Sequence, residues 1–298
     1  MSGRQAGGVI ADKIARQASL EESFGFMAVT TLELGQILCE LGQVGKHLSE
    51  IGAAEGAAGN LSVCFRERLD LTVCFPYTQV IELPVPAPDL AGATVIVTGS
   101  GRRLRDILTA PTANLACIVI EPGGRMGRML TAPDCQFKRV TSEFNSHLAV
   151  HHDQMRAREV RLHAVLHAQP IHLTFLSHLE PYQDEGYLNQ HLLRWQPETI
   201  LTFPQGIGIL PFLLPGSAQL TVETMLALRE HRVVIWSRHG VMARADDSLT
   251  HALDLIEYAE TAAHYEYLNL TSGDRSGGLS PEHIRAISAS WNVRQTIF

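Results

Sequence analysis

Apolar residues between positions 28 and 51 recur at steps of three and four, so they share one face of a helix. The residues that form this face are Leu32, Leu34, Ile37, Leu38, Leu41, Val44 and Leu48. The same spacing predicts further helices over 9–20, 141–158, 169–179 and 219–230, and a long one that starts near Asp247. We expect the chain to begin with a helical segment of about residues 1–50.

Short apolar runs bounded by turn residues predict strands between these helices. The runs are 61–65, 71–75, 94–97, 115–120, 162–166, 200–203 and 233–236. The turn Pro122-Gly123-Gly124 between 115–120 and Met129-Leu130 predicts a hairpin. Since helices and strands are interspersed and short turns join several strands, we expect a layered α+β or α/β domain with a mostly antiparallel sheet. No internal repeat or linker divides the chain, so a single domain over 1–298 is expected.

Composition narrows the class of protein. The 298 residues are 45% hydrophobic and 18% charged, which excludes a disordered chain. With 24 Lys and Arg against 31 Asp and Glu, the net charge of −7 argues against binding to nucleic acid. No apolar run reaches the ~18 residues that a membrane span needs. Five cysteines without a CxxC pair, and no apolar leader in residues 1–11, predict a reduced cytoplasmic protein.

Small and polar residues follow several of the predicted strands. They form the stretches Gly59-Asn60, Thr98-Gly99-Ser100-Gly101 and Thr141-Ser142-Glu143. Backbone N–H groups and hydroxyls of this kind bind an anion where they converge. Each stretch alone is weak evidence, because a Gly-Ser-Gly sequence is commonly a tight turn and Thr141-Ser142 is equally typical of a helix cap.

Histidine is unusually frequent, with fourteen in the chain and eight of them from His147 to His191. His167 and His239 each follow an apolar run, so Glu143, His167 and His239 could supply the three protein ligands of a catalytic zinc. The pair His147 and His151 has helical spacing but lacks the glutamate of an HExxH zinc motif. Most of the other histidines are expected to be ordinary core or surface residues.

Taken together, these stretches resemble the class II aldolase/adducin family over roughly residues 40–270. The resemblance is carried, in the family's order, by Gly59-Asn60-Leu61, Val97–Gly101, Thr141-Ser142-Glu143, Phe203–Pro211, Pro215-Gly216-Ser217 and His239-Gly240-Val241. It implies an αβα-layered domain, with helices on both faces of a mostly antiparallel sheet. It also implies a homotetramer with active sites at the subunit interfaces.

The resemblance also implies roles for individual residues. His167 and His239 match two ligands of one Zn²⁺ per subunit, Glu143 matches the acid/base glutamate, and Glu198 matches a second catalytic glutamate. The positions that match phosphate-binding residues are Asn60, Ser100, Gly101, Thr141 and Ser142.

The chain departs from the family pattern at one ligand position. Where the family has His-x-His, this sequence has His167-Ala168-Gln169. Three explanations stay open: Gln169 binds the metal through its oxygen, a nearby histidine (His172, His151 or His152) takes its place, or the metal site is degraded. Ala57 also replaces a polar residue of the phosphate loop.

The resemblance is greatest to family members that act on rhamnulose 1-phosphate. It implies metal-dependent cleavage of L-rhamnulose 1-phosphate to dihydroxyacetone phosphate and L-lactaldehyde. One alternative is another enzyme of the family acting on a ketose phosphate, such as a fuculose-phosphate aldolase, an epimerase or a dehydratase. The other is a metal-free, adducin-like interaction protein, which Gln169 would favour.

Overall fold

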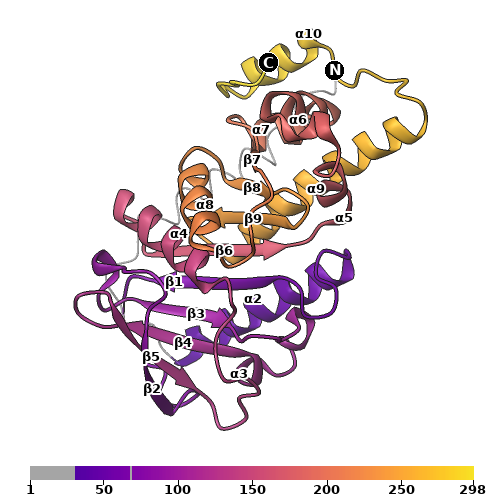
Figure 1. Cartoon of the computed structure of the whole chain (residues 1–298). Coiled ribbons are helices and arrows are strands. Elements are labelled where there is room, and N and C mark those ends of the chain that lie inside the picture. Colours follow the sequence, from indigo (N-terminus) through magenta and orange to yellow (C-terminus); the bar gives the residue numbers. More distant parts are fainter. Residues whose placement is uncertain (1–30, 68) are drawn as a thin grey trace, which may run out of the picture.

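The computed structural model describes residues 31–67 and 69–298; the predicted helix over 9–20 lies outside them. Within this part of the chain, nine strands form one sheet in the order β2-β5-β4-β3-β1-β6-β9-β8-β7 (Figure 1). The strands are β1 (Asn60–Phe65), β2 (Tyr77–Glu82), β3 (Thr94–Thr98), β4 (Leu115–Ile120), β5 (Met126–Thr131), β6 (Leu162–Ala168), β7 (Gly208–Leu210), β8 (Val233–Trp236) and β9 (Gly240–Ala245). Every neighbouring pair is antiparallel except β7 and β8, which confirms the mostly antiparallel sheet.

Helices cover both faces of this sheet, as the αβα architecture requires (Figure 1). The α-helices of the described residues are α2 (Thr31–Glu50), α3 (Pro111–Asn114), α4 (Phe144–Ala157), α5 (Ile171–Leu176), α6 (Glu185–Leu192), α7 (Pro197–Thr202), α8 (Ala218–Glu230), α9 (Leu249–Thr271) and α10 (Pro281–Ser290). The predicted helix over 28–51 corresponds to α2. Helices α2 and α9 bury their apolar faces in one large core cluster, while α4 and α8 pack on the opposite face.

Side-chain alternation along β1 shows how the sheet divides the core. Leu61, Val63 and Phe65 belong to the core cluster of α2 and α9, whereas Cys64 packs in the cluster that contains residues of α4. Because successive side chains of a strand point to opposite faces, Asn60 and Ser62 lie on the same face as Cys64. Two polar residues of β1 are therefore buried beneath α4.

Two of the predicted strands are wrong. Residues 71–75 form turns, in which the Asp70 carboxylate accepts hydrogen bonds from the backbone N–H and the hydroxyl of Thr72. Residues 200–203 lie mostly in α7, which Pro197 begins and Thr199 anchors by donating its hydroxyl to Leu193 O at 2.8 Å. In both segments, local hydrogen bonding outweighs the strand propensity of short apolar runs.

Strand β2 was not predicted, because it lies at the edge of the sheet and nearly all of its residues are exposed. The predicted hairpin is confirmed as β4 and β5. The helix expected from 141 begins three residues later, at Phe144, and neither Thr141 nor Ser142 caps it. Thr141 and Ser142 therefore lie in the loop that precedes α4.

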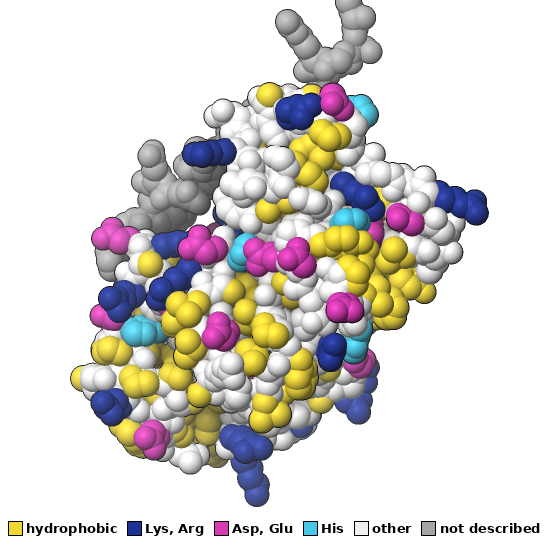
Figure 2. Space-filling view, turned by 45° about the horizontal axis from the view of Figure 1, so that its top comes forward, with side chains coloured by type: hydrophobic (Ala, Val, Ile, Leu, Met, Phe, Trp, Pro, Cys, Tyr) yellow, Lys and Arg dark blue, Asp and Glu magenta, His cyan; other side chains and the backbone are white. Residues whose placement is uncertain are grey.

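The surface agrees with the modest net charge. On the face in Figure 2, Lys and Arg side chains are interspersed with Asp and Glu and do not form one continuous basic area. None of the helices in the described residues combines the length and the apolar composition needed to cross a membrane.

Candidate active site

Four strand ends meet at one edge of the sheet. In an antiparallel pair the start of one strand lies beside the end of its neighbour. Asn60 at the start of β1 therefore pairs with His167 near the end of β6, and β1 also pairs with β3, which ends at Thr98. His239 precedes β9, the other neighbour of β6.

These ends surround a cavity of about 190 Å³. Its lining residues are Ala57, Ala58, Gly59, Asn60, Gly99, Ser100, Gly101, Arg102, Thr141, Ser142, Glu143, His167, Gln169 and His239. Every candidate site residue from the sequence lies here except Glu198.

Glu143, His167 and His239 form a compact cluster in this cavity. Glu143 Oε2 lies 3.5 Å from His167 Nε2, and Glu143 Oε1 lies 3.5 Å from His239 Nε2. Candidate ligand atoms of all three residues lie within 4.8 Å of one another. The residues come from three separate elements, so only the fold brings them together.

The hydrogen bonding of the two histidines fits a metal site. His167 Nδ1 lies 2.8 Å from Val241 O, and because a carbonyl oxygen only accepts, the proton of the neutral ring is on Nδ1. The lone pair on Nε2 then faces Glu143, as in a metal-binding histidine held by a carbonyl. His239 Nδ1 is buried without a hydrogen-bond partner in the described residues, and Trp236 packs beside both rings. One carboxylate and two imidazoles match the donor set of a catalytic zinc site.

Burial and neighbouring groups oppose each other at Glu143. Burial alone would raise the pKa of Glu143, but His167, the Asn60 amide and His239 outweigh it and lower that pKa below the usual value. Burial and the neighbouring His167 lower the pKa of His239, against the opposing effect of Glu143. An ionised Glu143 carboxylate and a neutral His239 imidazole are the forms in which these two side chains bind a metal.

The turn between β8 and β9 directs the His239 side chain toward Glu143 and His167. Arg238 in this turn has φ +64°, and its backbone N–H donates to Ser177 Oγ at 2.8 Å. At Gly240 a Cβ would lie 2.4 Å from Ala168 O and 3.1 Å from His167 Cε1. Only glycine allows β9 to lie this close to β6 at the cluster.

Small residues form the opposite wall of the cavity. Gly59 and Gly101 have positive φ values of +78° and +72°, which side chains rarely adopt. The backbone N–H of Ser100 donates to Arg139 O at 2.9 Å, and that of Thr141 donates to Thr98 O at 2.9 Å. Because these two backbone N–H groups are used in hydrogen bonds between the loops, the groups with which Ser100 and Thr141 can bind a ligand are their side-chain hydroxyls.

Sequence reasoning missed Arg102. Among the described residues that line the cavity, it is the one Arg or Lys. Its Nε donates to Asn114 Oδ1 at 2.9 Å, and Nη1 donates to Gln136 O at 3.2 Å. Its position directly after Ser100-Gly101 was the available clue, since a cation beside an anion-binding loop is a common pairing.

The Asn60 side chain is already engaged by the protein. Its Nδ2 donates to Glu143 Oε2 at 2.8 Å, and its Oδ1 lies 2.5 Å from His147 Nε2. The phosphate-binding role implied for Asn60 stays a prediction.

Glu198 lies outside the cavity, exposed in the first turn of α7. Gln169 lies inside it, beside the cluster.

The three histidines that could replace Gln169 are all engaged elsewhere. His172 Nδ1 lies 2.7 Å from Glu260 Oε1, and His152 Nε2 lies 2.9 Å from Asp89 Oδ2. His151 is fully buried, with its Nε2 2.7 Å from Ser62 Oγ. The structure therefore gives no support to a substitute histidine ligand.

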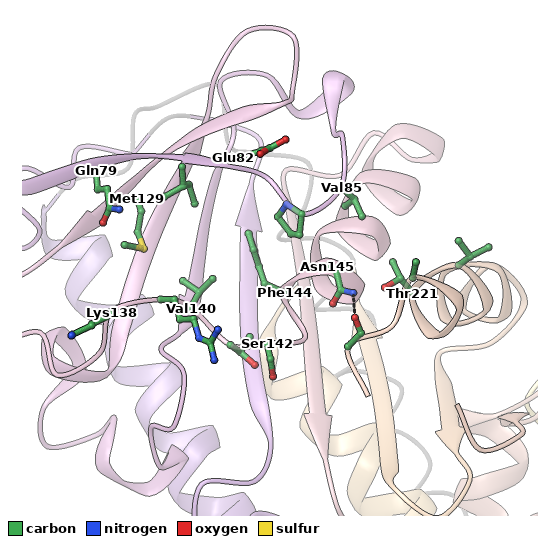
Figure 3. Close-up of a pocket in the computed structure, with 17 residues that line it drawn as sticks. Gln79, Glu82, Val85, Met129, Lys138, Val140, Ser142, Phe144, Asn145 and Thr221 are labelled. Atoms are coloured by element: carbon green, nitrogen blue, oxygen red, sulfur yellow. Dashed lines mark hydrogen bonds between the residues drawn. The ribbon is translucent and has the colours of Figure 1, made fainter. Parts of the chain in front are cut away.

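A second cavity of about 700 Å³ adjoins the first (Figure 3). Thr141 and Ser142 line both, and side chains such as Met129, Val140 and Phe144 make much of its wall apolar. Asn145 closes one side by donating to Gly216 O at 2.8 Å, drawn as a dashed line. The clustered titratable groups lie in the smaller cavity.

Comparison with known proteins agrees with this fold and site. Residues 39–267 match the family described as Class II Aldolase and Adducin N-terminal domain. A rhamnulose-1-phosphate aldolase of Bacteroides thetaiotaomicron is 29% identical over 264 residues, which cover 85% of this chain and 93% of that protein. One from Yersinia pseudotuberculosis is 28% identical, covering 74% of this chain and 79% of its own.

Solved structures show the same architecture. A sugar-phosphate aldolase from Thermotoga maritima has a TM-score of 0.70 and 27% identity, covering 82% of this chain and 99% of its own. An L-fuculose-1-phosphate aldolase from Thermus thermophilus, at 19% identity and TM-score 0.54, shares the fold, covering 81% of this chain and 98% of its own.

The fold and these matches define a layered lyase of the aldolase type. The chain belongs to the class II aldolase and adducin family.

Proposed function

We propose that this chain is a metal-dependent aldolase that cleaves L-rhamnulose 1-phosphate to dihydroxyacetone phosphate and L-lactaldehyde. The observation that carries the proposal is the cluster of Glu143, His167 and His239 beside an anion-binding wall of small residues. The relatives named rhamnulose-1-phosphate aldolase, matched over most of their length, support this substrate.

The proposed metal is one Zn²⁺ per subunit, held by His167 and His239, with Glu143 as a third ligand before substrate enters and Gln169 beside it. Bound there, Zn²⁺ would supply Lewis-acid stabilisation for the negative charge that develops on the ketose fragment.

The chain's own residues would bind the sugar phosphate and move one proton. Ser100, Gly101, Thr141 and Ser142 would anchor the phosphate, with Arg102 as its countercharge. As the C3–C4 bond breaks, its electron pair stays on the dihydroxyacetone phosphate fragment and the 4-hydroxyl loses its proton to become the aldehyde. The ionised Glu143 carboxylate would accept the proton that the 4-hydroxyl releases and deliver it to C3, so that no net proton is gained or lost.

We infer that Glu198 acts only in an assembly. It is exposed and outside the cavity of its own chain. In the expected homotetramer it would complete the site of a neighbouring copy, where it would organise the substrate hydroxyls or transfer a proton. The cytoplasmic location indicated by the cysteine pattern stays a prediction.

The test measures dihydroxyacetone phosphate released from L-rhamnulose 1-phosphate and from L-fuculose 1-phosphate, with chelator and with added Zn²⁺. We expect the rhamnulose substrate to be preferred, chelator to abolish cleavage and Zn²⁺ to restore it. Faster cleavage of L-fuculose 1-phosphate would instead indicate a fuculose-phosphate aldolase. A metal-free protein that is inactive even with Zn²⁺ would favour the adducin-like alternative.

The variant Glu143→Gln tests the proton role. It keeps the size of the side chain but cannot exchange a proton, so turnover should fall by about 10²–10⁴-fold. Phosphate binding, measured by calorimetry with dihydroxyacetone phosphate, should be largely retained. Wild-type turnover in Glu143→Gln would exclude Glu143 as the acid/base group.

A further inference from the structure

A chain of buried polar side chains leads away from Glu143 beneath α4. Its members are Asn60, His147, Ser62, His151 and His163, of which Asn60 is 7% exposed and the other four are fully buried. Ser62 Oγ lies 2.7 Å from both His147 Nδ1 and His151 Nε2. His151 Nδ1 lies 2.7 Å from His163 Nδ1. With the Asn60 contacts described above, the chain of hydrogen bonds is continuous from Glu143 to His163.

Regular secondary structure aligns these side chains. Asn60 and Ser62 are two residues apart on β1, and His147 and His151 are one turn apart on α4, so each pair shares a face. His163 on β6 pairs with Cys64, the next residue on that face of β1. The surrounding core is apolar, where a polar network is costly unless every member is satisfied.

The charge on Glu143 sets the direction of every hydrogen bond in the chain. A carboxylate only accepts, so the Asn60 amide turns its NH₂ toward Glu143 and its oxygen toward His147. That oxygen also only accepts, so His147 carries its proton on Nε2. A neutral imidazole has one donor and one acceptor, so His147 Nδ1 accepts from the Ser62 hydroxyl.

The same reasoning continues to the far end. Ser62 Oγ accepts from His151 Nε2–H, and His151 Nδ1 then accepts from His163 Nδ1–H. The lone pair of His163 is left on Nε2, which has no hydrogen-bond partner in the described residues and lies 3.9 Å from Asp246 Oδ1.

The charges at the far end keep His163 neutral. Asp246 is paired with Arg158 at 3.1 Å and with Arg244 at 3.6 Å, so these three side chains together carry a net positive charge. A positively charged His163 ring is disfavoured beside them. Burial, with Arg244 and Arg158, lowers the pKa of His163. Burial also lowers the pKa of His147, to about 3, so the rings are neutral and each has a defined tautomer.

This chain of hydrogen bonds orients the Glu143 carboxylate and does not supply it with protons. The link between His147 and Glu143 is the Asn60 amide, which does not pass a proton from its oxygen to its nitrogen as an imidazole does between its two ring nitrogens. We propose that His147 is a positioning residue that fixes the Asn60 amide and, through it, the Glu143 carboxylate, and that Ser62, His151 and His163 hold His147 in the required tautomer. This role rests on the proposed function, in which Glu143 transfers the proton.

The wrong tautomer of His147 has a direct consequence. With its proton on Nδ1, the ring would turn a bare Nε2 toward the Asn60 oxygen, and two lone pairs would repel at 2.5 Å. Rotation of the amide would relieve this contact but turn its oxygen toward the carboxylate. In the rotated amide nothing donates to Glu143 from Asn60, so the carboxylate loses the hydrogen bond that holds it.

The first test needs no variant. Long-range ¹H–¹⁵N correlation spectra of zinc-loaded wild-type protein labelled at histidine report which ring nitrogen carries the proton. We expect His147 and His151 to be protonated on Nε2 and His163 on Nδ1. The opposite pattern along the chain, or a charged His147, would overturn the proposal whether or not the protein cleaves a ketose phosphate.

The second test removes the central hydroxyl. Ser62→Ala leaves His147 free to take either tautomer, so kcat should fall roughly 10–100-fold, as for other groups that orient catalytic side chains. KM for the sugar phosphate should be unchanged, and the His147 spectrum should show a mixture of tautomers. The matched control is Ser146→Ala, which removes a buried hydroxyl of α4 that faces Thr221 instead.

The outcomes separate the two proposals. Wild-type kcat in Ser62→Ala would overturn the positioning role while leaving the aldolase proposal intact. If the protein shows the expected tautomers but cleaves no ketose phosphate, the aldolase proposal is refuted. The catalytic role of these hydrogen-bonded side chains is then refuted with it. If Ser62→Ala fails to fold, the wild-type spectrum still decides the direction of the hydrogen bonds.

Discussion

Gln169 is the residue that we expect to limit how strongly the proposed site binds a metal. It lines the cavity next to His167, and its backbone N–H donates to Ala53 O at 2.8 Å, so its main chain is fixed. A glutamine oxygen is a weaker zinc donor than an imidazole nitrogen. The site thus has two histidines and a carboxylate, and a histidine in place of Gln169 would bind Zn²⁺ more tightly than the glutamine does.

Gln169→His should therefore raise the affinity for Zn²⁺, by about ten-fold or more, equivalent to about 1.4 kcal/mol. Competition with a chromogenic chelator measures the change. His152→Gln, which alters a histidine paired with Asp89, serves as the control and should leave the affinity unaltered. An unchanged affinity in Gln169→His would mean that position 169 does not face the metal.

At the scale of elements, the β8–β9 hairpin and its contact with β6 set the spacing of the two histidines. Gly240 makes this contact possible, because no side chain fits between β9 and Ala168 O. The chain reverses direction within the three residues between β8 and β9. Arg238 therefore adopts a left-handed backbone conformation, which is unfavourable for a residue with a side chain.

Gly240→Ala should push β9 away from β6. We expect a loss of about 1–3 kcal/mol in the free energy of unfolding, as for other overpacked sites, and weaker Zn²⁺ binding because His167 and His239 separate. Urea denaturation and chelator competition measure the two effects. Gly35→Ala, in a helix with open space around the glycine, should instead be slightly stabilising. Equal behaviour of the two variants would contradict the close approach.

Elements also show where sequence patterns mislead. The periodic apolar faces of α2 and α9 are long enough to identify each helix, whereas 71–75 and 200–203 are too short to separate a strand from a turn or a helix end. Strand β2 has too few buried residues to give an apolar pattern.

At the scale of the whole molecule, the fold buries neutral histidines between the sheet and α4. Burial and His151 lower the pKa of His147 to about 3, and burial lowers those of His151 and His163 as well. In the unfolded chain each would titrate near the ordinary value of about 6.5. Below that pH the unfolded state therefore binds more protons than the folded one, and acid favours unfolding.

Stability of the metal-free protein should be highest above about pH 6.5 and fall as the pH drops toward about 3, by up to about 1.4 kcal/mol per pH unit for each buried histidine. Urea unfolding between about pH 7 and pH 5 measures this slope. His163→Gln should make it shallower, while His178→Gln, at an exposed position, should not. A stability independent of pH in this range would show that these rings bind as many protons in the folded state as in the unfolded state.

The sequence by itself determined the family, the mostly antiparallel sheet and nearly all of the residues that line the cavity, because motifs at strand ends are local and strand ends meet at one edge. The sequence singled out His167 as a candidate ligand but assigned no role to the helical pair His147 and His151. Only the tertiary structure joins these two histidines to Asn60 and Ser62 through hydrogen bonds. Their roles depend on hydrogen bonds between residues more than eighty positions apart, which no local pattern records.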